Sequence, residues 1–230
     1  ENTLFIGDSA NAPYGQKSKE EIIALSKKNV EWLLNQNAKI IIVACNTATT
    51  NAITELRATY NVPIIGIEPA IKPAALNSKS GKVGVLATQG TLLSKKYSEA
   101  QTQYPDITFI NQIGYRIVQI IEEGGLYSEE LKDLLHLYLD PMIAANIDYL
   151  VLGCTHYPYL TPILKNILPP NVTIIDSGVA VANRTLKILK DNKLLKTDTL
   201  IGNAEFYTNK DKEILQSFID GFGTAKKIDF

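Results

Sequence analysis

The chain has 230 residues, 45% of them hydrophobic, and a formal net charge of −1. That length and hydrophobic content allow one large or two small domains with a sizeable core. The balanced charge argues against a nucleic-acid-binding protein, which usually carries a basic face. No apolar run reaches the roughly 18 residues of a membrane span, and no basic-then-apolar leader opens the chain. We therefore expect a cytoplasmic protein that binds neither nucleic acid nor membrane, with its two cysteines as free thiols.

Short apolar runs alternate with helix-like segments along the chain. Strands are predicted, in chain order, at 3–6, 39–44, 62–67, 82–87, 107–110, 148–153 and 172–175. The runs are rich in Ile and Val and mostly apolar at consecutive positions, which is typical of strands buried on both faces. The alternation of strand and helix predicts an α/β fold with parallel sheets.

Two amphipathic helices stand out between these strands. Residues 19–35 place apolar residues near one face, and Ser18 begins a capping-box pattern in front of them. Residues 128–145 form the second helix, for which Ser128 is the predicted N-cap. Pro141 is expected to kink or end that helix, because proline lacks the N–H of a helical hydrogen bond.

The only two cysteines occupy similar sequence frames. Residues 43–48 read VACNTA and residues 152–157 read LGCTHY, so a small residue precedes each cysteine and a hydrogen-bonding side chain follows it. Each cysteine comes where a buried strand is predicted to end, and in α/β sheets the carboxyl ends of strands form the ligand crevice. We therefore expect both thiols at functional edges. Either cysteine alone is equally consistent with a buried structural role.

A mirrored pair of thiols suits a nearly symmetric reaction. Two isolated cysteines and two histidines lack the spacing of a zinc site, and a cysteine protease needs one nucleophile with a histidine base. Racemisation removes a Cα proton from one face and returns a proton to the other, which a thiolate and a thiol can do together. The chain contains no G-x-G-x-x-G and no P-loop. No cofactor and no metal is expected.

Five segments resemble the cofactor-independent glutamate racemases of bacterial cell-wall synthesis, in order and at family spacing. They are 7–15 (GDSANAPYG), 44–48 (ACNTA), 64–70 (IIGIEPA), 153–158 (GCTHYP) and 175–178 (IDSG). The resemblance runs from about residue 3 to the end of the chain. It implies an isomerase that interconverts L- and D-glutamate by a two-base mechanism and supplies D-glutamate for peptidoglycan. Cell-wall biogenesis, a part in cell shape and a homodimer are implied with it.

The resemblance also implies roles for single residues. Cys45 would exchange the proton on the D-glutamate side, and Cys154 on the L-glutamate side with the assistance of His156. The implied substrate-binding residues are Asp8, Pro13, Tyr14, Gly15, Asn46, Thr47, Thr88, Glu122 and Thr155. Some of them could have a purely structural role: the Pro-Tyr-Gly segment is also typical of a turn, and Thr88 could cap a helix. Glu122 could lie at a solvated helix end, and Glu123 competes with it for the position of the site acid.

The family arrangement implies two similar parallel-sheet α/β domains that face each other across an active-site cleft. The first would comprise residues 1–66 and 178–230, the second residues 67–177, and each would contribute one cysteine. The family also opens with a strand that ends in Asp-Ser-Gly, whose Asp supports the first cysteine. No such segment precedes Glu1 in the sequence. We therefore expect the sheet of the first domain to lack a strand and the Cys45 half-site to be incomplete.

Three other functions stay open. The nearest is a racemase of aspartate or another acidic amino acid, although relatives that act on other substrates typically have Glu where His156 stands. A catalytically disabled relative would bind a ligand without exchanging its Cα proton. A thiol-based redox sensor would need the Cα atoms of Cys45 and Cys154 within about 7 Å of each other.

Overall fold

The computed structural model describes residues 1–197, 200–219 and 221–230. The strands are β1 (Thr3–Gly7), β2 (Ile41–Val43), β3 (Ile64–Gly66), β4 (Lys82–Ala87), β5 (Thr108–Ile113), β6 (Tyr149–Gly153), β7 (Thr173–Ile175), β8 (Ala204–Thr208) and β9 (Ala225–Lys227). The helices are α1 (Lys19–Asn35), α2 (Asn46–Thr59), α3 (Ile71–Asn77), α4 (Gln89–Leu92), α5 (Lys95–Gln101), α6 (Ile117–Glu122), α7 (Glu129–Ala144), α8 (Thr161–Ile167), α9 (Gly178–Asp191) and α10 (Lys212–Phe218). Short 3-10 helices span Ser9–Asn11 (η1), Tyr14–Gln16 (η2) and Tyr157–Leu160 (η3).

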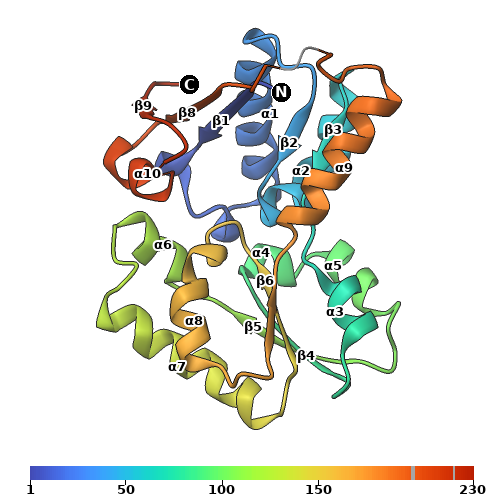
Figure 1. Ribbon diagram of the computed structural model, residues 1–230, viewed down its shortest axis with the longest axis vertical. Coiled ribbons are helices and arrows are strands. Elements are labelled where there is room, and N and C mark those ends of the chain that lie inside the picture. The colour runs from blue at the N-terminus through green and yellow to red at the C-terminus, as the bar shows by residue number, and fades with distance from the viewer. Residues whose placement is uncertain (198–199, 220) are drawn as a thin grey trace.

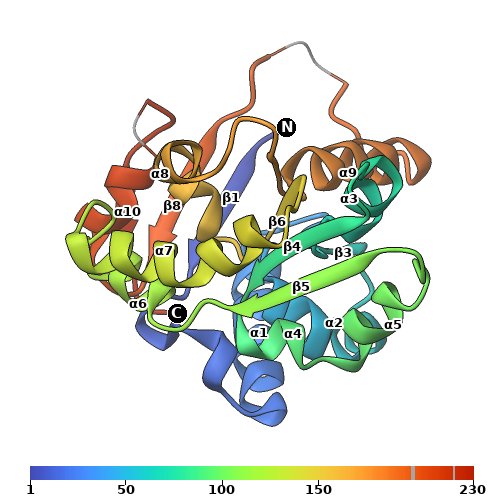
Figure 2. The ribbon, with the colours of Figure 1, turned by 90° about the horizontal axis from the view of Figure 1, so that it is seen from below.

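The elements form two lobes (Figure 1). The lower lobe in that view is built on a parallel sheet with the strand order β5-β4-β6-β7. Alternate residues of its central strands enter two different cores, as strand geometry requires. Val83 and Val85 of β4 pack with α3 and α5, whereas Leu150 and Leu152 of β6 pack with α6, α7 and α8. Figure 2 shows these two helix groups on opposite sides of the sheet.

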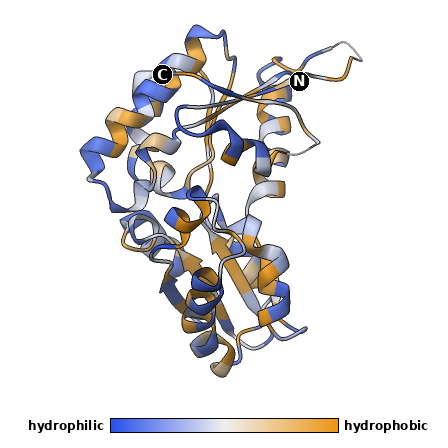
Figure 3. Ribbon diagram, turned by 90° about the vertical axis from the view of Figure 1, so that its left-hand side faces the viewer, coloured by the Kyte–Doolittle hydropathy of each residue, from blue (hydrophilic) through white to orange (hydrophobic). Residues whose placement is uncertain are grey.

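The upper lobe contains two parallel sheets, β1-β8-β9 and β2-β3. Helices α1 and α2 pack against β2 and β3 around a core that includes Ile22, Ile41, Leu56 and Ile64. Helix α10 packs on β8 and β9 in a smaller core. Figure 3 shows the apolar residues of both lobes on the inward sides of helices and along the strands. The prediction of two parallel α/β units is thereby confirmed.

Strands β1 and β2 each have one edge without a strand partner among the described residues. Residues 4–7 and 41–44 line the same cavity. Successive side chains of a strand point to opposite faces, so four consecutive lining residues show that each strand presents its edge to this cavity. Ser26 Oγ and Asn29 Oδ1 of α1 also lie there, buried and without a hydrogen-bond partner in the described parts of the chain. The space between β1 and β2 is therefore a slot with unused backbone and side-chain polar groups.

The chain passes between the lobes twice, after β3 and after β7, and the two crossings touch. The Ser177 hydroxyl of the second crossing donates a hydrogen bond to the Glu68 carbonyl of the first. The Glu68 carboxylate also forms an ion pair with Lys96 of α5. The two crossings are thus joined at one point beside the cleft.

The predicted elements agree with the structure except in two regions. Helix α1 spans the predicted residues, and the Ser18 side chain accepts the Glu21 N–H as an N-cap. Helix α7 is not ended by Pro141 but continues to Ala144. Pro141 is exposed and lies in the last turn, where water can replace the hydrogen bond that proline cannot make. Strands β8 and β9 were not predicted, and no described helix is both long and apolar enough to cross a bilayer.

Candidate functional site

The first cysteine lies where β2 gives way to α2. Cys45 is the N-cap of α2, and its Sγ accepts the Ala48 N–H at 3.4 Å. Asn46 and Thr47 follow in the first turn and are buried, and Asn46 Oδ1 has no partner among the described residues. Burial raises the pKa of the Cys45 thiol to about 11, because it penalises the thiolate more than the backbone N–H stabilises it. This half of the site presents a neutral thiol.

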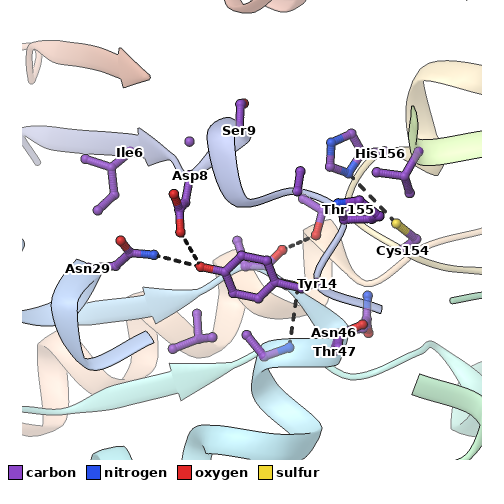
Figure 4. Close-up of a pocket in the computed structure, with 18 of the residues that line it drawn as sticks. Ile6, Asp8, Ser9, Tyr14, Asn29, Asn46, Thr47, Cys154, Thr155 and His156 are labelled. Carbon is purple, nitrogen blue, oxygen red and sulfur yellow. Dashed lines mark hydrogen bonds between the residues drawn. The ribbon is translucent and has the colours of Figure 1, made fainter. Parts of the chain in front are cut away.

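The second cysteine follows β6 and has a charged partner. Cys154 is 8% exposed, and its Sγ lies 3.9 Å from Nδ1 of His156. Nε2 of the same imidazole lies 2.7 Å from Glu122 Oε1 (Figure 4 shows His156 beside Cys154). Burial alone lowers the pKa of His156, but the hydrogen bonds with Cys154 and Glu122 outweigh it and raise that pKa to about 10. At neutral pH a positive imidazolium therefore stands beside the Cys154 sulfur.

One cavity of about 300 Å³ contains every candidate residue. Those lining it are Asp8, Pro13, Tyr14, Gly15, Cys45, Asn46, Thr47, Thr88, Glu122, Cys154, Thr155 and His156. Glu123 is absent from its lining and pairs with Arg116 on the surface instead. The geometry therefore favours Glu122 over Glu123 as the acid of this site, while the roles of the individual residues stay predictions.

Three threonine hydroxyls join the two lobes at the floor of the cavity. Thr47 Oγ1 lies 2.7 Å from Thr88 Oγ1, which lies 3.0 Å from Thr91 Oγ1. The loop before α1 closes over this cluster at Gly15, where a side chain would come within 2.9 Å of Thr88 Cβ. Thr155 adds a further link by donating to the Ala44 carbonyl across the cleft. Hydroxyls from both lobes therefore face the same small volume.

A second polar cluster surrounds Asp8. Tyr14 Oη donates to Asp8 Oδ2 at 2.5 Å and accepts a hydrogen bond from Asn29 Nδ2 at 3.2 Å (Figure 4). Asn11 and Asn209 donate to the other Asp8 oxygen. Burial, followed by the neighbouring Asp8 carboxylate, raises the pKa of Tyr14, so the phenol keeps its proton and fixes the Pro-Tyr-Gly loop on Asp8.

Sequence motifs missed several polar residues of the site. Asn29 sits in the middle of α1, and Ser9 lies inside a motif whose neighbours alone received roles. Both line the cavity. No local pattern marks Asn29, and the motif that contains Ser9 does not show its contact with Glu122, because both contacts arise only when the chain folds around the cleft.

The arrangement can move protons from two directions without a metal centre built from its own residues. Among the described residues no group of three His, Cys, Asp or Glu side chains could hold a metal ion. What the cavity does offer is two thiols from different lobes, one of them beside an imidazolium, together with several hydroxyl and amide groups that can hold carboxylates.

Comparison with known proteins assigns the family. A sequence model of the Asp/Glu/Hydantoin racemase family matches residues 2–185. The chain belongs to this family. A glutamate racemase of Pseudomonas putida is 42% identical over 221 residues, which cover 95% of this chain and 83% of that protein.

Solved structures of family members share the fold. The structure of Escherichia coli glutamate racemase in complex with L-glutamate and the activator UDP-MurNAc-Ala has a TM-score of 0.84 and 29% identity, covering 98% of this chain and 87% of that one. Glutamate racemase from Francisella tularensis in complex with D-glutamate has a TM-score of 0.81 and 27% identity, covering 100% and 88%. The two-lobed α/β arrangement is thus the arrangement of these racemases.

Proposed function

We propose that this chain interconverts L- and D-glutamate by a two-thiol mechanism. The observation that carries the proposal is that Cys45 and Cys154, the only cysteines, line one cavity from two different lobes. The glutamate racemases that the chain resembles in sequence and fold support glutamate as the substrate, and two of their structures hold its L and D forms.

The proposed reaction uses the thiols in turn. A thiolate on one side takes the Cα proton, which leaves the electron pair on Cα, and the thiol on the other side then gives its proton to the opposite face. The acceptor ends as a thiol and the donor as a thiolate, and proton exchange with water restores the starting forms. Following the family resemblance, we assign L-glutamate to the Cys154 side, where the His156 imidazolium would stabilise negative charge on sulfur. Cys45 would serve D-glutamate.

The polar groups of the cavity account for binding and for Cα acidity. Thr47 and Thr88 supply hydroxyl groups, and the N-terminus of α2 supplies backbone donors for a carboxylate. Such donors in a site closed off from water stabilise charge that spreads from Cα toward the carboxylate. A cavity of about 300 Å³ admits a small amino acid and is at the low end for ligand pockets.

Loss of the Cα proton in heavy water tests the proposal. We expect L-glutamate and D-glutamate both to exchange, and racemisation to stop in Cys45→Ala and in Cys154→Ala. His136→Gln is the matched control, because that exposed histidine lies on α7 outside the cavity. Exchange with aspartate in place of glutamate would move the assignment to an aspartate racemase. Binding of glutamate without exchange would point to the disabled relative.

We also propose the domain division 1–66 with 178–230 and 67–177, with one further strand seated in the slot between β1 and β2. Residues 198, 199 and 220 of that first domain lie outside the described ones. The contact of Ser177 with Glu68 at the crossings supports the division, and the free edges with the unpartnered Ser26 and Asn29 atoms support the strand.

A chain carrying an added upstream segment that ends in Asp-Ser-Gly tests the strand. Its β1 and β2 amides should exchange hydrogen more slowly than those of the 230-residue chain, because edge N–H groups gain partners. Its Cys45-dependent exchange of D-glutamate should be faster. An unchanged protection of both strands would refute the strand.

We also propose a cellular role, a location and an oligomeric state for this chain. Peptidoglycan precursor synthesis, with its part in cell-wall biogenesis and cell shape, a cytoplasmic location and a homodimer all follow from the family resemblance. Sedimentation of the purified chain measures the oligomer, and rescue by this chain of a bacterial strain that depends on added D-glutamate measures the cellular role.

A further inference from the structure

One carboxylate oxygen in the cavity accepts hydrogen bonds from both lobes. Glu122 Oε1 lies 2.7 Å from His156 Nε2, within its own lobe, and 3.4 Å from Ser9 Oγ of the other lobe. The Glu122 side chain is only 11% exposed. No other side-chain partner of Glu122 is found among the described residues, so Ser9 and His156 together determine where this carboxylate lies.

Apolar contacts hold the two lobes together on the same flank. Phe218 of α10 stacks on Tyr159 of η3 with ring centroids 4.3 Å apart and an interplanar angle of 21°. These residues line the cavity together with Ser9 and Glu122. The stack and the hydrogen bond therefore form one contact region between the lobes. In its polar part, Ser9 contacts Glu122, which is the hydrogen-bond partner of His156.

We propose that Ser9 is a positioning residue that couples contact between the lobes to the protonation of His156. Its hydroxyl holds Glu122 Oε1 in place, and Oε1 in turn stabilises the imidazolium beside Cys154. When the lobes separate, the aromatic stack and the Ser9 hydrogen bond are lost together, and His156 becomes easier to deprotonate. The inference rests on the proposed function only for its consequence, which is that Cys154 has its charged neighbour when the cleft is closed.

Among the described groups around His156, only Ser9 can position Glu122 from the opposite lobe. The titratable side chains that face the imidazole and its carboxylate are Cys154, Glu122 and Tyr159. The nearby Arg116 forms its ion pairs with surface carboxylates instead. The Asp8 carboxylate is occupied by Tyr14 and by asparagine side chains. The Ser9 hydroxyl is thus the donor from the opposite lobe that reaches the pair.

Titration of the histidine ring signals by NMR tests the role without any substrate. The chain has two histidines, and His136 is exposed on α7, so it provides an internal reference in every spectrum. We expect Ser9→Ala to lower the midpoint of His156 by about 0.5–1 pH unit, the scale of one typical net hydrogen bond. Ser9→Thr keeps the hydroxyl and should restore the midpoint. An unchanged or raised midpoint in Ser9→Ala, or an equal shift in Ser9→Thr, overturns the proposal.

The aromatic stack tests the coupling to lobe contact. Phe218→Ala removes the stack without touching the carboxylate, so it should lower the His156 midpoint in the wild-type background and leave it unchanged in the Ser9→Ala background. Phe222→Ala, at an exposed position close by in sequence, should change neither. Additive shifts in the double variant overturn the coupling. If Ser9→Ala does not fold, an unchanged midpoint in Phe218→Ala alone does the same.

These readouts separate this inference from the racemase assignment. A chain that fails to exchange the Cα proton of glutamate can still show the Ser9-dependent midpoint, and a working racemase can lack it.

Discussion

Gly153→Ala probes how closely the two central strands must approach beneath the site. Gly153 pairs with Ala87 across β6 and β4, and both precede site residues, Cys154 and Thr88. A Cβ at Gly153 would lie 2.6 Å from Ala87 Cβ. Carbon atoms in contact need about 3.5 Å, so the strands must separate by roughly 1 Å at their carboxyl ends.

The cost follows from that displacement. Overpacking of a filled core costs about 1–3 kcal/mol of unfolding free energy, and a 1 Å misplacement of catalytic groups can cost on the order of 10²-fold in rate. Urea denaturation measures the first, and Cα proton exchange of glutamate measures the second. We expect both to fall in Gly153→Ala.

The reciprocal swap is the decisive control. Ala87→Gly in the Gly153→Ala background restores the space and should recover most of the activity. Stability should recover as well, because the swap leaves one glycine in this strand pair, as in the wild type. Gly84→Ala, deeper in β4, would bring a Cβ to 2.8 Å from Met142 Sδ and should destabilise the fold while the folded fraction keeps its activity. Full activity in Gly153→Ala, or no recovery in the swap, would refute the steric explanation.

Two further predictions concern stability. Ser128→Ala removes the N-cap that accepts the Leu131 N–H of α7, so urea denaturation should show a loss of about 1 kcal/mol. Asp148 is desolvated, but hydrogen bonds from Ser78 Oγ and the N–H groups of Ser80 and Lys79 outweigh this and lower its pKa. Because the pKa of Asp148 is lower in the folded than in the unfolded chain, the ionised carboxylate stabilises the fold above the unfolded pKa of about 3.9. This stabilisation is lost as the pH falls from there through the folded pKa. Asp148→Asn should therefore cost about 1–3 kcal/mol at pH 7 and progressively less toward pH 3, measured by denaturation across that range.

Local sequence was sufficient where burial and capping act within one segment. The strands of the lower lobe are apolar at consecutive positions, and the caps Ser18 and Ser128 precede amphipathic helices, so these elements could be predicted. Strand β8 (AEFYT) has no such run, since only its pairing with β1 gives it a place in a sheet. Pro141 is the opposite case, because the helix is not ended there: the residue lies in an exposed last turn.

Some residues of the site could likewise be predicted from the sequence, and others could not. The two cysteines stood out because each follows a predicted strand, and the family resemblance implied the other candidates, all of which line the cavity. Ser9 and Asn29 were given no role, because each acts through a contact with a residue that is distant in sequence. Their importance is a property of the folded cleft.

The joined crossings decide how this molecule can move. Because the Ser177 hydroxyl ties the second crossing to the Glu68 carbonyl of the first, the two connections cannot slide past each other while the bond holds. This joint acts together with the other contacts between the lobes, which include the Thr47–Thr88 and Thr155–Ala44 hydrogen bonds. Figure 1 shows the α10 and α6 flank on the side of the cleft away from the β3–α3 crossing. The Phe218–Tyr159 stack is thus an interlobe contact far from the crossings, where any rotation about the crossings would displace side chains more than it does beside them.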